Sequence, residues 1–162
     1  MANIDNFTSE EWWQLKQAPL AVAMYVSGAD QRTGPLGTIK ELSAPFDAAK
    51  KEIASAPAGS LLLELLNEWS MLIGSTEQAG APANLGTGGN LLSFITNVGK
   101  LLDAKASLKD AQAVKQWLAK AAKISAEAGK EGGVLGLGGE KVSDAETRAL
   151  SEIGLALGVA VQ

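Results

Sequence analysis

Acidic side chains are the only groups in this sequence whose types and spacing could form a site. Asp30 and Glu41 lie on either side of a glycine-containing break between two expected helices. Asp144 and Glu146 occupy a comparable place at the start of the last expected helix. If each helical hairpin closes, its carboxylates face one turn and offer the hard oxygen ligands that calcium and magnesium prefer. The sequence therefore predicts a weak divalent-cation site, with Asp30 and Glu41 as the main pair.

Helix capping is the alternative role for three of these carboxylates. Glu41, Asp144 and Glu146 are expected in the first turns of helices, where the helix dipole favours negative charge and free N–H groups need acceptors. Ser143 precedes Glu146 by three residues, which is the spacing of a capping box. Capping is the commoner role for any one acidic residue at such a position, so both interpretations stay open.

Several other chemistries are excluded by what the sequence lacks. It contains no histidine and no cysteine, which removes imidazole bases, thiol catalysis, disulfides and the usual zinc sites. The glycine-rich segment 132–141 does not have the spacing of a phosphate-binding loop, because Gly139 is followed by Glu140. No serine has the histidine or lysine partner of a nucleophile.

Paired carboxylates could also act as general acid and base, as they do in sugar hydrolysis. Nothing in the sequence sets their separation, and aromatic residues make up only 5% of the chain. We therefore expect a binding domain without catalytic activity. A protein-interaction or scaffolding module without metal is one alternative, and a carboxylate-dependent hydrolase is the other.

The net charge of −4 gives no positive field that would attract nucleic acid or anionic lipid. The start of the chain has neither a basic region nor an apolar run, and the most apolar segment, 61–73, is too short to span a bilayer. These features predict a soluble, cytoplasmic protein that does not insert into membranes. A protein partner or self-association is compatible with them, and the only cofactor that the sequence admits is a divalent cation such as calcium.

Helical spacing of apolar residues predicts an all-α fold of about six helices in one domain, residues 1–162, built from two helix-loop-helix halves, 7–74 and 90–161. A glycine-rich loop, 75–89, lies between the halves. In the second helix, 36–54, Ile39 begins the expected core face and Glu41 falls on the polar face. The helix at 61–73 is apolar nearly all round, so we expect it at the centre of the bundle.

Two short segments resemble the helix, acidic turn and helix of the tellurite-resistance TerB-like proteins. In the first half they are Ala29-Asp30, a turn, and then Lys40-Glu41. In the second half, segment 142–146 leads into the helix at 149–159. TerB-like proteins are small, acidic and all-helical.

This resemblance implies a bacterial stress-response or metal-sensing protein rather than an enzyme. It also implies that the metal-associated acidic positions of the family correspond to four residues of this chain, Asp30, Glu41, Asp144 and Glu146.

Overall fold

Every secondary-structure element in the described part of the chain is helical, which confirms the all-α prediction. The computed structural model describes residues 4–29, 35–72, 89–129 and 142–160. The predicted helix limits agree with the observed ones to within a few residues. The elements are a 3-10 helix, η1 (Ile4–Asn6), and the helices α1 (Ser9–Ala29), α2 (Pro35–Glu52), α3 (Leu61–Leu72), α4 (Gly89–Lys105), α5 (Leu108–Ala128) and α6 (Asp144–Leu157).

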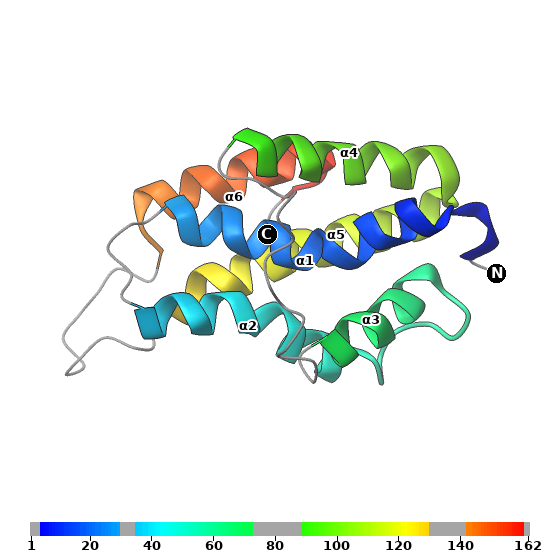
Figure 1. Ribbon diagram of the computed structural model, residues 1–162, viewed down its shortest axis with the longest axis horizontal. Helices are drawn as coiled ribbons and strands as arrows, with labels where there is room; N and C mark the ends of the chain where they lie inside the picture. The colour runs from blue at the N-terminus through cyan, green and yellow to red at the C-terminus, as the bar shows by residue number, and fades with distance from the viewer. Residues whose placement is uncertain (1–3, 30–34, 73–88, 130–141, 161–162) are drawn as a thin grey trace.

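Helices α1 and α5 form the centre of the molecule. They lie side by side and run in the same direction, and each packs against all the other α-helices (Figure 1). Helices α2 and α3 cover one side of this pair, and α4 and α6 cover the other. The two halves of the chain therefore share one core.

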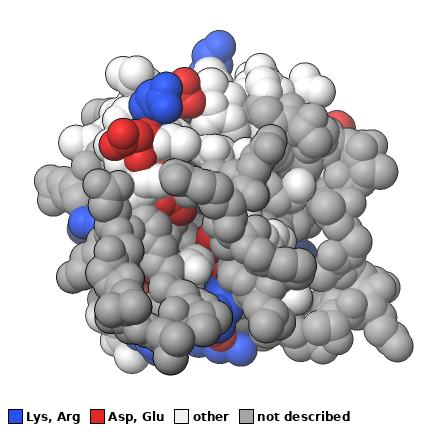
Figure 2. All heavy atoms as spheres, turned by 90° about the vertical axis from the view of Figure 1, so that its left-hand side faces the viewer, with Lys and Arg blue, Asp and Glu red and all other residues white. Residues whose placement is uncertain are grey.

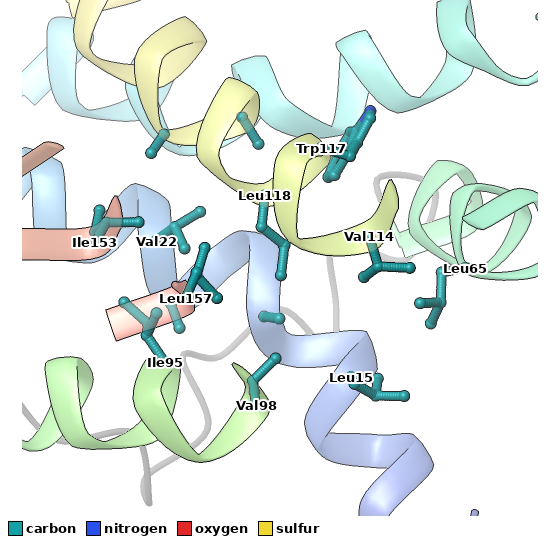
Figure 3. Close-up of a cluster of buried hydrophobic side chains, with 14 of the residues drawn as sticks. Leu15, Val22, Leu65, Ile95, Val98, Val114, Trp117, Leu118, Ile153 and Leu157 are labelled. Carbon is teal, nitrogen blue, oxygen red and sulfur yellow. The ribbon is translucent and has the colours of Figure 1, made fainter. Parts of the chain in front are cut away.

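The core is a single cluster of buried hydrophobic side chains to which all six α-helices contribute (Figure 3). Full burial of one such side chain stabilises a fold by roughly 1.5–3 kcal/mol. The indoles of Trp69 and Trp117 extend the cluster as a stacked pair, with ring centroids 4.5 Å apart. Residues at its middle include Leu15, Val22, Leu65, Ile95, Val98, Val114, Leu118, Ile153 and Leu157.

The prediction that the helix at 61–73 lies at the centre of the bundle was wrong, because α1 and α5 occupy the centre. Helix α3 packs mainly on α2, with smaller contacts to α1 and α5, and the side chain of Met71 is 74% exposed. Leu65 and Trp69 are fully buried, as expected. The outer stripe consists of Glu64, Glu68 and Met71, whose helical spacing gives α3 one solvent-facing side despite its many leucines.

The core face predicted for the second helix was wrong at its N-terminal end. Ile39 is 62% exposed, whereas Glu41, which we expected on the polar face, is completely buried. Glu41, Pro45 and Ala49 follow one another at intervals of four residues, so they share the face that packs inward. Phe46 is buried beside them, as predicted.

The two central helices begin alike. At the start of α1, the Thr8 hydroxyl accepts a hydrogen bond from the Glu11 N–H at 3.2 Å, and the Glu11 carboxylate accepts one from the Thr8 N–H at 2.7 Å. At the start of α5, the Ser107 hydroxyl accepts one from the Asp110 N–H at 3.1 Å. Each helix contains 21 residues and is followed by a returning helix. The two halves are thus similar helix-loop-helix units.

No helix among the described residues is long and apolar enough to cross a membrane.

Candidate functional site

Four helix ends meet at one end of the molecule. Helices α1 and α5 end there, and α2 and α6 begin there (Figure 1). Figure 2 looks onto this end, where acidic and basic side chains of described residues are both visible. Because both hairpins turn at the same end, the fold brings the two predicted acidic regions to one end of the bundle.

Glu41 is buried between α2 and α5. Its side chain has an exposed fraction of 0%, and α2 packs more extensively on α5 than on any other helix. The backbone carbonyl of Glu41 accepts a hydrogen bond of 2.7 Å from the hydroxyl of Ser125 on α5. Among the described residues, neither carboxylate oxygen of Glu41 has a hydrogen-bond partner. Residue 41 is therefore anchored through its backbone while its charged group is unpaired.

Gly129, which caps the C-terminal end of α5, provides the space that the Glu41 side chain occupies. A Cβ atom at residue 129 would overlap Oε1 of Glu41 and would lie 2.7 Å from its Cδ and 2.9 Å from its Cγ. Carbon atoms in proteins do not approach this closely without displacement. The carboxylate thus packs directly on the backbone at the end of α5, and any side chain at residue 129 would move it.

The surroundings of the Glu41 carboxylate do not match the capping interpretation. No acidic residue lies in the first turn of α2, so Glu41 is too far along the helix to cap it. Its carboxylate instead lies at the C-terminal end of α5, where the helix dipole and the last carbonyl groups are negative. A carboxylate beside partial negative charges favours a positively charged neighbour.

Glu146 is buried to the same degree, but its carboxylate takes part in a capping box. Its carboxylate accepts a hydrogen bond of 2.7 Å from the Ser143 N–H, and the Ser143 hydroxyl accepts one of 3.2 Å from the Glu146 N–H. The predicted capping box at the start of α6 is confirmed. Asp144 lies in the same first turn and is exposed, so it adds negative charge at the positive end of the helix.

The cation site predicted from Asp30 and Glu41 stays a prediction, because Asp30 lies outside the described residues. Within the described ranges, no group of three or more His, Cys, Asp or Glu side chains is arranged to hold a metal ion. Glu41 and Glu146 lie on α2 and α6, which both pack on the central helix pair. Any cation at Glu41 would therefore need oxygen ligands other than clustered carboxylates.

Sequence reasoning missed the contacts that Ser125 of α5 and its C-terminal cap Gly129 make with Glu41. From the sequence, Ser125 was placed on the apolar face of the fifth helix and Gly129 at the start of the glycine-rich connection, and neither was expected to contact Glu41. A signal was present in the spacing: Ser125 and Gly129 are four residues apart, so they lie on one face of α5, and both are small. Such a face lets another helix approach closely.

Comparison of the sequence with protein-family models and with curated proteins, and of the fold with solved structures, found no match.

Proposed function

We propose that this chain is a small non-catalytic helical domain that binds a divalent cation such as calcium, with Glu41 as the charged ligand. The observation that supports this proposal is the carboxylate of Glu41, which is fully buried and has no hydrogen-bond partner. An ionised carboxylate buried without a partner costs several kcal/mol, and a bound cation would offset that cost. A single buried carboxylate is a sparse site, so we expect affinity in the millimolar range, as in weak calcium modules.

A binding role fits this end of the molecule better than hydrolysis does. General acid–base catalysis by two carboxylates needs both groups free to exchange protons beside a substrate. Glu146 has its carboxylate engaged in the capping box, and Glu41 has no exposed atom to present to a sugar-sized molecule. The hydrolase alternative would require a second free carboxylate facing Glu41.

The resemblance to TerB-like proteins supports the same proposal. In that family the acidic residues near the helical turn are associated with metal, and Glu41 is the matching position that the structure describes as unpaired. On this basis we propose a role in bacterial stress response or tellurite resistance, served by cation binding rather than by catalysis.

The interaction-module alternative would place the function on exposed apolar side chains. In the described part of the chain, the large exposed apolar residues are distributed one to each of six elements, η1, α1, α2, α3, α5 and α6. Isolated apolar residues are normal on the surface of a folded protein. This distribution favours the cation-binding proposal. The six residues are Ile4, Trp13, Ile39, Met71, Leu108 and Leu155.

Calcium-dependent thermal unfolding tests the proposal. Calcium at ten times its dissociation constant should stabilise the wild-type protein by about 1.4 kcal/mol, which raises the melting temperature by about 3–6 °C relative to a chelator. Glu41→Gln should abolish this shift. Asp47→Asn is the matched control, because it removes an exposed carboxylate from the same helix and should leave the shift unchanged. A wild-type protein that melts identically with calcium and with chelator contradicts the proposal.

A further inference from the structure

We infer that the cation is held between the two halves of the chain. Its ligands are the Glu41 carboxylate of α2 and backbone carbonyl groups at the C-terminal end of α5. Gly129 makes this arrangement possible. This inference rests on the proposed function and names a second set of ligands for the same cation. The sequence alone placed Glu41 in a site within the first hairpin. The structure places its carboxylate against the end of the first long helix of the second half.

The chemistry of the two partners is complementary to a hard cation. Calcium is commonly bound by a combination of carboxylate oxygens and backbone carbonyl oxygens. The last carbonyl groups of a helix point away from its end, where together they carry about half a negative charge. The Glu41 carboxylate lies against the backbone of Gly129, the residue that caps this helix end. With nothing positive between them these groups repel one another, and a cation converts the repulsion into binding.

The surrounding contacts hold the carboxylate in place. Ser125 donates its hydroxyl to the Glu41 carbonyl, which fixes the backbone of α2 against α5 one turn before the end of that helix. Gly129 leaves room for the carboxylate, whereas a Cβ at that residue would occupy the position of Oε1. Gly129 is therefore a positioning residue, because it contributes through the place of Glu41 and not through a side chain of its own.

Substitution of two helix-end glycines separates this inference from a general effect of alanine. Gly129→Ala should displace the carboxylate and weaken calcium binding at least tenfold, measured by titrating the thermal shift with calcium. Gly28→Ala is the matched control, because Gly28 lies near the end of α1 and an added Cβ there meets no atom within 4 Å. The control should bind calcium as the wild type does. Circular dichroism should show native helix content for both variants.

The outcomes distinguish the inference from the proposed function. If the wild type shows no calcium-dependent shift, both are overturned. If the shift is lost in Glu41→Gln but kept in Gly129→Ala, the proposed function stands and the role of the α5 end is overturned. If Gly129→Ala does not fold, Glu41→Asp decides, because it keeps the charge, adds no atom and withdraws the carboxylate by one methylene. A tenfold loss of affinity in Glu41→Asp supports the inference, and unchanged affinity overturns it.

Discussion

Glu41 and Glu146 are both buried at the same end of this molecule, but their carboxylates have opposite surroundings. Their side chains are 0% and 1% exposed, respectively. Glu146 is the third residue of α6 and accepts a hydrogen bond from the backbone N–H of Ser143. Glu41 lies beyond the first turn of α2, and its carboxylate packs on the end of α5 without a hydrogen-bond partner. The two carboxylates are equally buried, but Glu146 lies at the N-terminal end of a helix and Glu41 lies at a C-terminal end.

The difference shows that the nearest helix terminus, rather than burial, decides what a buried glutamate does. The N-terminal end of α6 offers N–H groups and positive partial charge, so Glu146 stabilises the fold as built. The C-terminal end of α5 offers carbonyl groups and negative partial charge, so Glu41 is favourable only with an added positive group. One glutamate is held in a capping box, and the other is the ligand that we propose for the cation.

The largest effect should come from replacing the unpaired glutamate by an apolar residue of similar length. Glu41→Met removes a buried carboxylate that has no hydrogen-bond partner among the described residues, so in the presence of a chelator we expect the free energy of unfolding to rise by about 1–4 kcal/mol. Urea unfolding of the variant and the wild type measures this change. A loss of stability would mean that the Glu41 carboxylate has a favourable partner in the absence of cation. Glu41 and Glu146 would then not differ in the way described above.

The same substitution at the paired glutamate should have the opposite sign. Glu146→Met leaves the buried N–H of Ser143 without an acceptor and removes half of the capping box. We expect the free energy of unfolding to fall by about 1–3 kcal/mol, in calcium and in chelator alike. Glu146→Gln keeps an acceptor and should lose less. Equal effects of methionine at residues 41 and 146 in chelator would remove the distinction between the two sites.

Much of the fold could be predicted from the sequence because its signals are local. Ser107 and Ser143 predicted helix starts, and both cap as expected. Proline is a signal for a bend or a break in a helix, yet α1 and α2 each continue past theirs, Pro19 and Pro45. A helix interior tolerates proline when packing compensates for the lost hydrogen bond, and both prolines here are buried.

The surroundings of Glu41 could not be predicted, because they depend on contacts distant in the chain. Ser125 and Gly129 follow Glu41 by more than 80 residues, and only the packing of α2 on α5 brings them together. A local rule places glutamate on a solvent-facing stripe, and tertiary packing overrides that rule here. The Glu146 role was accessible because its partner is three residues away.

The smallest expected effect concerns a contact that joins the two hairpins independently of Glu41. The Tyr25 hydroxyl on α1 donates a hydrogen bond of 2.5 Å to the Glu152 carboxylate on α6. Burial and this hydrogen bond to an anion raise the pKa of Tyr25 from 10 to about 12. Because the pKa is higher in the folded state, the contact contributes stability below pH 10 that is lost as the pH rises towards 12.

Tyr25→Phe measures that contribution directly. The side chain is partly buried but its hydrogen bond to Glu152 is exposed, so screening limits the effect to less than about 1 kcal/mol below pH 10, with the variant the less stable protein. The difference in unfolding free energy between variant and wild type should shrink between pH 10 and 12. Because Tyr25 is the only tyrosine in the sequence, ultraviolet absorbance of the wild type follows its ionisation specifically. Calcium response should be the same in both proteins, because this contact lies between α1 and α6 rather than between α2 and α5. If Tyr25→Phe abolished the calcium response, binding at Glu41 would depend on the distant contact between α1 and α6. The contrast between Glu41 and Glu146 would then not arise from their immediate surroundings.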